Sequence, residues 1–530
     1  EFWTSHPDGG YDVKETSSAA HFYGKPIASA EAFTGSRYYH CFADQKNSAD
    51  YAYAFGVNEF VLCASAYQPW IDKYPGSTAG GKHYCLNRNN TYWEYSRPFW
   101  DYQARCSALM RKGVPVVDIC VYLGQNPPVK LVTYRLPEIP EGYDFDVCTA
   151  EALVGRTMAV DGRLTLPTGI SYSLLVIQRN NDMPLHVLRH IAGLVKGGVI
   201  VCGPRPDGSD SLKDKAESEE YRALVDELWG ELTTVSQIRK VGKGKIYENI
   251  PLSEVLKYEN IRPDIAIKSG NTAKDKVYFV HRRLSDADVY FLNNHSDRAF
   301  HDTIRLRTDA RQAEYWDAVT GQRYMIPVKA SGEKGMLLNL TLAPRESGFI
   351  VTSNNQATGL LPRIADVQET ITPIEGSWNV YFDPRWGGPG KVVFDELIDW
   401  TVHADTGIRY YSGTAVYHKE LNLAMPAQNE RLLLRFPRLG SLARVWVNGK
   451  EVVTVWCSPW EADITSYVHE GKNNLKIEVV NSLMNRMIGD ASLPESERFT
   501  YAYPQIATPT DKLVPSGIME QLNLVYRQCQ

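Results

Sequence analysis

The chain has 530 residues, which is too long for a single hydrophobic core and predicts three or four domains. Its 43% hydrophobic and 22% charged residues are ordinary for a globular protein, and a net charge of −5 gives no sign of a nucleic-acid or polyanion binder. Aromatic residues reach 11%, which suits sugar-binding clefts as well as large β-rich cores.

Signatures of several other protein classes are missing from the sequence. The nine Cys are scattered without a CxxC pair, so we predict neither a zinc ribbon nor a disulfide framework. No stretch is long and apolar enough to cross a membrane, so no membrane partner is expected. The polar start, EFWTSHPDGG, shows no signal peptide and lacks Met, which indicates a processed or truncated N-terminus.

The first 130 residues alternate helices and strands. We expect helices over 11–25, 48–58 and 91–113, and strands over 26–31, 59–70 and 114–124. The first helix should end at Gly24, and the third should kink near Pro98. Strands of this kind indicate parallel pairing in an α/β layer or barrel. Because a (β/α)8 barrel needs eight strands, residues 1–135 would be only the C-terminal part of one.

Three further domains are predicted downstream. Residues 136–245 should form a small doubly wound, flavodoxin-like α/β domain, although its GGVIVCGPRPDG segment lacks the GxGxxG order of a nucleotide site. Residues 246–357 carry short alternating strands at the spacing of a β-sandwich. Residues 358–530 predict a second sandwich, of the jelly-roll kind, with a hairpin turn at Asn448–Gly449.

Five blocks lie in order between residues 26 and 153: AEAFTG, ASAYQPW, NRNNTYWEYSRPFWDYQARC, YLGQNPP and GYDFDVCTAEAL. Together they resemble the α-L-rhamnosidases of glycoside hydrolase family 106. Three later blocks, GIRYYSGTAVYHKEL, ARVWVNGKEV and VVNSLMNRMIGD, resemble the galactose-binding-like sandwich that accompanies this family and family 2. The resemblance covers most of the chain and is weakest between residues 240 and 360.

The resemblance implies an inverting, calcium-assisted exo-enzyme of the bacterial periplasm or of the secreted fraction. Its implied substrate is terminal α-L-rhamnose in plant or algal oligo- or polysaccharides. It further implies that the early barrel strands, with the general acid, lie outside this chain, so that an upstream segment would complete the barrel. Two alternatives stay open: a non-catalytic carbohydrate-binding or scaffold fragment, and another barrel exo-glycosidase such as a β-galactosidase.

Glu31 is the candidate catalytic residue. Inverting hydrolysis uses a carboxylic acid and a carboxylate base roughly 6.5–9.5 Å apart. Barrel enzymes place such groups at the C-terminal ends of strands, and Glu31 closes the strand PIASA just before a Gly turn. By position it is either a general base or a rim carboxylate in a structural salt bridge. The family resemblance favours the base.

Candidate substrate-binding residues follow two other predicted strands. Tyr67, Gln68 and Trp70 end the second strand, where Trp70 could stack on a sugar and Gln68 could bind hydroxyls, or both could simply pack under a loop. Tyr143 and Asp144 lie in the acidic, aromatic segment GYDFD. That segment could cover the pocket, bind a cation or merely cap a turn.

A third group of candidates lies in the loop KHYCLNRNNTYW. His83, Asn87 and Arg88 present amide, guanidinium and imidazole groups that suit sugar hydroxyls. The structural alternative is that Asn90 or Thr91 caps the following helix and that His83 is an ordinary loop histidine.

Other polar and aromatic residues are expected to be structural. Asp118 lies within a strand and should need a buried partner. Trp446, Trp456 and Trp460 of the last domain could form a sugar-binding face, but packing is the favoured role.

Overall fold

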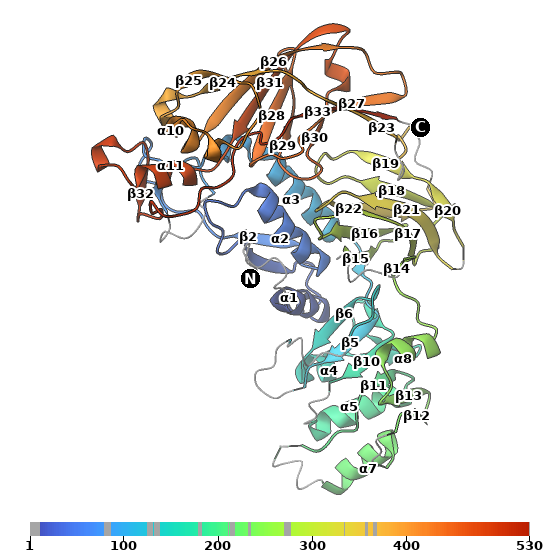
Figure 1. Cartoon of the computed structure of the whole chain (residues 1–530). Helices are drawn as coiled ribbons and strands as arrows, with labels where there is room; N and C mark the ends of the chain where they lie inside the picture. The colour runs from blue at the N-terminus through green and yellow to red at the C-terminus, as the bar shows by residue number, and fades with distance from the viewer. Residues whose placement is uncertain are drawn as a thin grey trace.

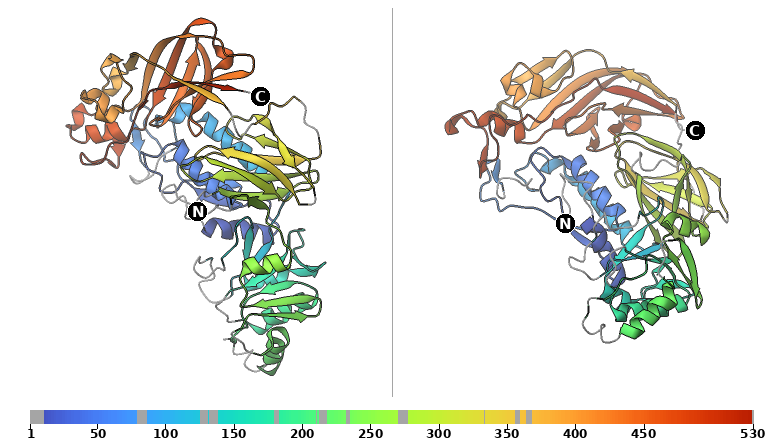
Figure 2. Two further views of the ribbon diagram at one scale, coloured as in Figure 1. Left: turned by 45° about the vertical axis from the view of Figure 1, so that its right-hand side comes forward. Right: turned by 60° about the horizontal axis from the view of Figure 1, so that its bottom comes forward.

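The computed structural model describes residues 11–78, 86–124, 131, 138–178, 183–209, 211, 218–231, 235–269, 277–332, 334–355, 359–363 and 368–528. They form four units (Figure 1). An α/β unit and two β-sandwiches follow one another along an arc, and the N-terminal unit lies on its inner side (Figure 2). No helix in these ranges is long and apolar enough to cross a membrane.

The N-terminal unit is a pair of parallel strands backed by helices. Its elements are α1 (Tyr11–Phe22), β1 (Ser29–Ala32), α2 (Phe42–Ala54), β2 (Glu59–Leu62), β3 (Pro75–Ser77), a 3-10 turn (Trp93–Tyr95) and α3 (Arg97–Met110). Ala30 and Ala32 of β1 pack into one core with Phe42 of α2 and Phe99 of α3. The chain leaves α1 at Gly24 with φ +66°, as predicted for a helix end.

Two predicted helices begin at other residues. Helix α2 starts at Phe42 instead of residue 48, because the Asp44 carboxylate accepts a hydrogen bond from the backbone N–H of Cys41 (2.8 Å) and closes a capping box. The predicted helix over 91–113 is α-helical only from Arg97 to Met110. Pro98 therefore lies in a first turn, where it is tolerated, and marks no kink.

The strand predicted over 114–124 belongs to other units. β4 (Val114–Pro115) pairs with a strand of the following sandwich, and β5 (Ile119–Tyr122) pairs on both sides within the α/β sheet. The placement of the third barrel strand was therefore wrong, and the N-terminal unit ends before β4 and not at residue 135. Buried parallel strands are hydrophobic in a barrel and in a doubly wound sheet alike, so the sequence alone could not decide to which of the two this strand belongs.

The α/β unit has the strand order predicted for a flavodoxin-like sheet. The sheet contains β5, β6 (Phe145–Cys148), β10 (Leu174–Ile177), β11 (Ile200–Cys202), β12 (Gln237–Val241) and β13 (Gly244–Glu248). A separate antiparallel sheet consists of β7 (Met158–Val160), β8 (Arg163–Thr165) and β9 (Ser171–Tyr172). The parallel strands lie in the order β6–β5–β10–β11–β13, which is 2-1-3-4-5 along the chain, and β12 adds an antiparallel edge.

Helices cover both faces of that sheet. They are α4 (Ala150–Arg156), α5 (Leu185–Lys196), α7 (Ser218–Trp229) and α8 (Leu252–Tyr258). Cys120 and Tyr122 share a core with α5 and α7, whereas Ile119 and Val121 share the opposite core with α8. Because α8 completes this second core, the unit extends past the predicted boundary at residue 245.

The third unit is a β-sandwich, as predicted. One sheet contains β14 (Ile265–Ile267), β17 (Phe300–Leu306), β21 (Met336–Leu342) and β20 (Val328–Ala330). The other contains β19 (Arg323–Ile326), β18 (Gln312–Trp316), β22 (Ser347–Ser353), β16 (Ala287–Asn294), β15 (Val277–Arg283) and β4. Alternate side chains of β21 are buried, which is the pattern of a sheet with one face on a core.

The C-terminal unit is also built from two antiparallel sheets. The first contains β23 (Glu369–Pro373), β33 (Asn523–Gln528), β27 (Glu430–Arg435) and β30 (Glu461–Asp463). The second contains β25 (Gly390–Phe394), β24 (Trp378–Phe382), β26 (Thr414–Leu423), β31 (Gly471–Val480), β28 (Leu442–Val447) and β29 (Lys450–Val455). Its short elements include α10 (Thr406–Arg409), α11 (Met484–Asp490) and β32 (Tyr501–Tyr503). Asn448 and Gly449 both have positive φ between β28 and β29, which confirms the predicted hairpin turn.

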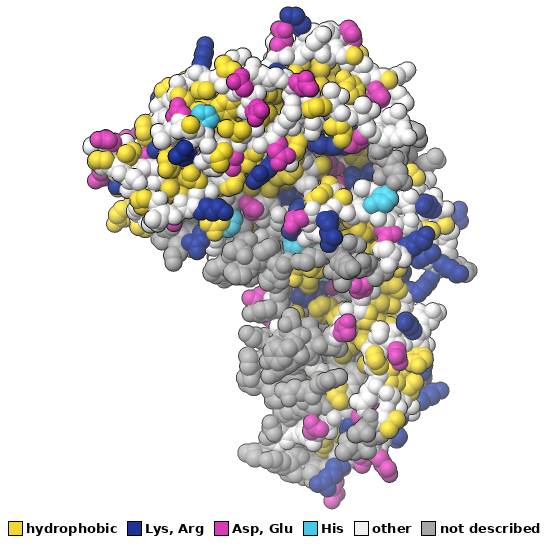
Figure 3. All heavy atoms as spheres, in the orientation of Figure 1, with side chains coloured by type: hydrophobic (Ala, Val, Ile, Leu, Met, Phe, Trp, Pro, Cys, Tyr) yellow, Lys and Arg dark blue, Asp and Glu magenta, His cyan; other side chains and the backbone are white. Residues whose placement is uncertain are grey.

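Buried contacts join the units. Arg307 of the third unit pairs with Asp118 of the α/β unit at 2.7 Å, which is the partner that a buried Asp118 was predicted to need. Trp456 of the C-terminal unit is buried against Phe99 of α3, with ring centroids 5.7 Å apart, so its role is packing, as favoured from the sequence. Charges of both signs are interspersed over the C-terminal sandwich on the face shown in Figure 3.

Candidate active site

Glu31 lies on the uncovered side of β1. The parallel register sets Glu31 opposite Val61 of β2. Side chains alternate along a strand, so the burial of Ala30 and Ala32 against the helices turns Glu31 to the other face, where it is exposed. Its carboxylate makes no hydrogen bond or ion pair with a described residue. The alternative role for Glu31, a rim carboxylate in a structural salt bridge, therefore finds no cationic partner among the described residues.

A strained turn follows Glu31. Phe33 has φ +64°, a left-handed conformation that is rare for a bulky residue, and its ring is buried against Phe60 and Phe99 at 5.9 Å each. Gly35, at φ +70°, completes the turn. Such backbone strain persists only where the surroundings impose it, and it clusters at functional sites. The end of β1 is therefore a firmly fixed position.

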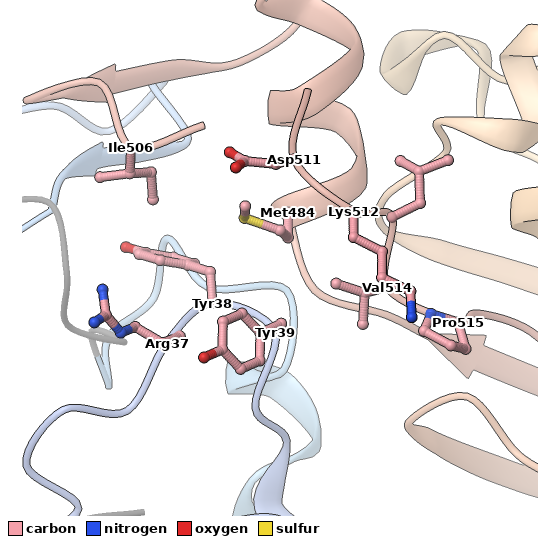
Figure 4. Close-up of a pocket in the computed structure, with 10 residues that line it drawn as sticks. Arg37, Tyr38, Tyr39, Met484, Ile506, Asp511, Lys512, Val514 and Pro515 are labelled. Atoms are coloured by element: carbon pink, nitrogen blue, oxygen red, sulfur yellow. The ribbon is translucent and has the colours of Figure 1, made fainter. Parts of the chain in front are cut away.

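The connection from β1 to α2 lines a cavity of about 590 Å³. Arg37, Tyr38 and Tyr39 form one wall, and the other wall comes from the C-terminal unit (Figure 4). That second wall consists of Met484, Ile506, Asp511, Lys512, Leu513, Val514 and Pro515. The cavity thus lies at the carboxyl end of β1, where barrel enzymes place their active sites. Glu31 is not among its lining residues.

Tyr67, Gln68 and Trp70 do not end the second strand, contrary to the prediction, because β2 stops at Leu62. They lie in the loop that follows it. Tyr67 is 84% exposed and is available to a ligand. The Gln68 side chain exchanges two hydrogen bonds with the backbone of Ser77, donating to its carbonyl (2.6 Å) and accepting from its N–H (2.9 Å). The side-chain amide of Gln68 therefore stabilises the conformation of this loop. Arg88 donates to the carbonyls of Gln68 and Trp70, each at 3.2 Å.

Asn87 and Arg88 thus belong to the same braced loop as Gln68 and Trp70. The Asn87 Oδ1 accepts from the backbone N–H of Asn89 (2.9 Å), while its buried Nδ2 has no hydrogen-bond partner among the described residues. Asn90 Oδ1 accepts from the N–H of Tyr92 (3.1 Å), but neither Asn90 nor Thr91 is a helix cap as the structural alternative expected, because the N-cap residues are Tyr92 for the 3-10 turn and Ser96 for α3. His83 lies outside the described residues.

The C-terminal unit holds this loop from the other side. β3 pairs in parallel with β32, with Pro75 opposite Tyr501. Trp70 meets the Tyr501 ring edge to face at 5.1 Å, and Lys73 Nζ lies 4.1 Å from the Tyr501 centroid, a cation–π distance. The two units therefore present their loops together at this end of the N-terminal unit.

Tyr143 and Asp144 lie at a different place. They line a separate cavity of about 480 Å³ together with Ala54 and Phe55, at the C-terminal end of α2. The Arg37–Tyr39 segment precedes the N-terminal end of the same helix, and 13 residues of α-helix span roughly 20 Å. The structure therefore does not bring Tyr143 and Asp144 together with the loops that follow β1 and β2.

Both residues have structural partners. Tyr143 donates to the carbonyl of Ile261 (2.6 Å), and burial raises its pKa to about 12. Burial also raises the pKa of Asp144, against the opposing attraction of Lys14 at 2.7 Å. For the neighbouring Asp146, burial is outweighed by His21 at 2.8 Å and by Lys14, and its pKa lies well below the usual range. This buried cluster fastens α1 to the α/β unit.

Several cavity residues were not identified from the sequence. Arg37 and Tyr39 lie in GSRYYH, directly after the strand and turn of Glu31, and this position was a signal that could have found them. Asp511 and Lys512 lie more than 470 residues further along the chain, in a stretch without a local motif. Only the packing of the C-terminal unit places them at the cavity.

Comparisons with known proteins agree with this architecture. The sequence model of the alpha-L-rhamnosidase family, glycoside hydrolase family 106, matches residues 1–329, and that of the family 2 sugar binding domain matches residues 365–526. The structure of a rhamnosidase from Novosphingobium sp. PP1Y matches with a TM-score of 0.88 at 29% identity, covering 97% of this chain and 49% of that one.

A curated protein from Formosa agariphila, named "Putative beta-glucuronidase", is 24% identical over 93% of this chain and 60% of its own length. The chain thus spans between about half and three fifths of these two relatives. Because the first family model covers more than half of the 530 residues, the chain belongs to the α-L-rhamnosidase family, glycoside hydrolase family 106.

Proposed function

We propose that this chain carries one side of the active site of an inverting α-L-rhamnosidase. The enzyme would remove terminal rhamnose from plant or algal polysaccharides in the periplasm or outside the cell. The observation that carries the proposal is Glu31, an exposed carboxylate at the fixed end of a parallel strand, with no ion-pair or hydrogen-bond partner among the described residues. Support comes from the match of 97% of the chain to a rhamnosidase structure.

In this proposal Glu31 is the general base. Its carboxylate takes a proton from water as that water attacks the anomeric carbon, and an acid on the opposite side of the sugar protonates the leaving oxygen. On the same face of the two strands, Glu59 is already paired with Arg111 at 2.7 Å. No second free carboxylate stands opposite Glu31 among the described strands, so the acid would come from elsewhere.

An upstream segment that completes the barrel is the proposed source of that acid. The described part of the sheet has β1 and β2 alone, whereas a closed parallel barrel has eight strands. Val61, opposite Glu31, is 59% exposed, and a parallel sheet is normally covered on both faces. Further strands placed beside β1 and β2 would enclose this face and leave Glu31 pointing into the barrel.

Calcium, which the family resemblance implies, would need ligands in addition to Glu31. Calcium takes six to eight oxygen ligands, many of them carboxylates. The described ranges contain no group of three or more His, Cys, Asp or Glu side chains that could hold a metal ion. Glu31 alone does not make such a site, and no step of the proposed reaction passes through calcium.

The loops after β1 and β2 are proposed to bind the substrate. Exposed Tyr67 and the Arg88 side chain would contact the sugar, and Trp70 would do so from its place beside Tyr501. Gln68 and Asn87 would act mainly by shaping the loop. For Tyr143 and Asp144, substrate contact stays a prediction without support from their position.

A panel of 4-nitrophenyl glycosides tests the proposal. The protein with its complete barrel should hydrolyse the α-L-rhamnoside and leave the β-D-galactoside and β-D-glucuronide intact. The last substrate belongs in the panel because of the name of the Formosa relative. Hydrolysis of another glycoside in place of the rhamnoside would contradict the proposal. Glycan binding without hydrolysis, unchanged by Glu31→Gln, would favour a non-catalytic binding or scaffold role.

A further inference from the structure

The cavity at the carboxyl end of β1, named here the Tyr39 pocket, has walls from two units. Arg37 and Tyr39 come from the N-terminal unit, and Asp511, Lys512 and Met484 come from the C-terminal unit (Figure 4). Its volume of about 590 Å³ lies within the range of about 300–1,000 Å³ that is usual for small-molecule sites. The pocket is therefore large enough for a bound ligand.

The lining combines flat apolar surface with hydrogen-bonding groups. Tyr39 is 48% exposed, so its ring and hydroxyl are accessible, and Met484 adds apolar surface beside it. Neither the Arg37 guanidinium nor the Lys512 ammonium makes an ion pair with a described residue, so both side chains can donate hydrogen bonds to a ligand. Asp511 accepts from the N–H of Thr508 (2.8 Å) and keeps further acceptor capacity. This mixture fits a pyranose ring, which has an apolar face and a rim of hydroxyls.

The position of the pocket determines which sugar it would hold. The Arg37–Tyr39 segment begins six residues after Glu31 and lies on the same side of the N-terminal unit as the end of β1. Glu31 does not line the pocket, so the bond that it would help to cleave lies beside the pocket and not inside it.

We propose that the Tyr39 pocket binds the sugar residue adjacent to the terminal rhamnose, on the leaving-group side of the scissile bond. This inference rests on the proposed function. Tyr39 stacks on the apolar face of that residue, and Arg37 and Lys512 donate to its oxygens. The C-terminal sandwich therefore contributes to substrate selection, although it carries no catalytic group in this scheme.

Binding measured on this chain by saturation-transfer NMR tests the assignment without requiring hydrolysis. The probes are methyl α-L-rhamnopyranoside, α-L-rhamnosyl-(1→6)-D-glucose and α-L-rhamnosyl-(1→4)-D-glucuronic acid. At least one disaccharide should bind more tightly than the methyl glycoside. Tyr39→Ala should weaken disaccharide binding about fivefold to tenfold, the loss expected for one aromatic contact.

Two further variants keep the result interpretable. Lys512→Gln, on an exposed side chain, should weaken the same disaccharide, and Tyr258→Ala, which removes an exposed tyrosine of α8, should not. Equal weakening of the methyl glycoside and the disaccharides would overturn the assignment to the leaving-group sugar. Failure of both disaccharides to bind, or binding that neither pocket variant changes, would overturn the site itself. The nitrophenyl panel decides the proposed function separately.

Discussion

The parallel strands of the N-terminal unit and those of the α/β unit differ in how they are covered. In the α/β sheet, Val121 is fully buried beneath α8, and its neighbour Tyr122 is buried on the other face. In the N-terminal unit, Val61 is exposed next to Glu31, and the described helices pack on the opposite face of the strands. The α/β sheet is thus covered on both faces. Among the described residues, the β1–β2 pair is covered on one face only, and its exposed face bears the proposed catalytic group.

This contrast teaches that the N-terminal unit depends on its neighbours. α2 and α3 are fixed to the third unit through Lys46, whose Nζ lies 2.7 Å from Asp50 and 2.7 Å from the Ser347 hydroxyl, all buried. Tyr102 of α3 also donates to Asp50. The α/β unit, by comparison, has helices of its own on both faces of its sheet.

The largest effect on stability is expected from removing the Lys46 contact between α2 and the third unit. Lys46→Met should destabilise the chain by about 3–5 kcal/mol, because it leaves the buried Asp50 carboxylate without its positively charged partner. The matched change Lys196→Met on α5 removes an exposed pair with Glu227 and should cost only about 0–1 kcal/mol. Urea denaturation followed by tryptophan fluorescence measures both.

Adding Asp50→Asn to Lys46→Met should restore part of the lost stability, since the buried charge is then removed as well. Equal midpoints for Lys46→Met and Lys196→Met would show that the N-terminal unit does not rely on this contact.

A pair of valine substitutions sharpens the comparison of the two sheets. Val121→Ala should cost about 2 kcal/mol for the lost buried methyl groups and the cavity they leave, whereas Val61→Ala should change stability by less than about 0.5 kcal/mol. Thermal unfolding of the chain measures both. When the barrel is complete, Val61→Ala should become comparably destabilising. If Val61→Ala stays neutral there, β2 is not enclosed by further strands.

A smaller and local effect is expected at the contact between the β2 loop and the C-terminal unit. Tyr501→Ala removes a cation–π and edge-to-face contact worth roughly 0.5–2 kcal/mol, so residues 67–78 should exchange amide hydrogens faster. Hydrogen–deuterium exchange with mass spectrometry resolves this segment from the rest. Tyr503→Ala, on an exposed tyrosine two residues away, is the matched control. Unchanged exchange in Tyr501→Ala would show that the strand pairing of β3 with β32 suffices.

The smallest expected effect is a pH dependence at the junction of the α/β unit and the third unit. Burial lowers the pKa of His281, but hydrogen bonds to Asp264 (3.1 Å) and Asp288 (3.0 Å) outweigh it and raise the pKa overall. For Asp288, burial is outweighed by His281 and Thr308, which lower its pKa to about 2.

The raised pKa fixes the sign of the effect. The stability that His281 contributes is fully present below its unfolded pKa of about 6.5 and is lost as the pH rises through the higher folded value. The Asp288 contribution is present above its unfolded pKa of about 3.9 and is lost only as the pH falls toward 2. The stability gap between wild type and His281→Gln should therefore shrink between pH 6 and 9. A gap that is constant over that range would contradict the assignment, and His418→Gln, on an exposed histidine, serves as the control.

Local signals in the sequence were sufficient for several features of this fold. Gly24 ends a helix and Asn448–Gly449 makes a hairpin because positive φ favours these residues, and no distant contact is needed to know it. The need of Asp118 for a partner was equally foreseeable, but the identity of that partner, Arg307, depends on how two units pack.

Features that depend on tertiary contacts were not foreseeable in the same way. The strand at Ile119–Tyr122 fits either parallel sheet by its hydrophobicity, and only packing assigns it to the α/β unit. The start of α2 was missed because Cys41 is an unusual capping residue, although Asp44 was a usable signal. At the candidate site, the position of Glu31 was predicted from its place at the end of a short strand before a Gly turn, whereas the pocket wall at Asp511 and Lys512 required the C-terminal unit to be in place.

The central claim, that Glu31 is the catalytic base of a rhamnosidase, is tested most directly by rhamnose release from 4-nitrophenyl α-L-rhamnoside. The assay needs the protein with its complete barrel and the variants Glu31→Gln and Glu254→Gln, the second being an exposed carboxylate on α8. Loss of the base should lower kcat by at least about a hundredfold, and Glu254→Gln should leave it within about twofold of wild type. If Glu31→Gln keeps activity near that of wild type, Glu31 is not the base.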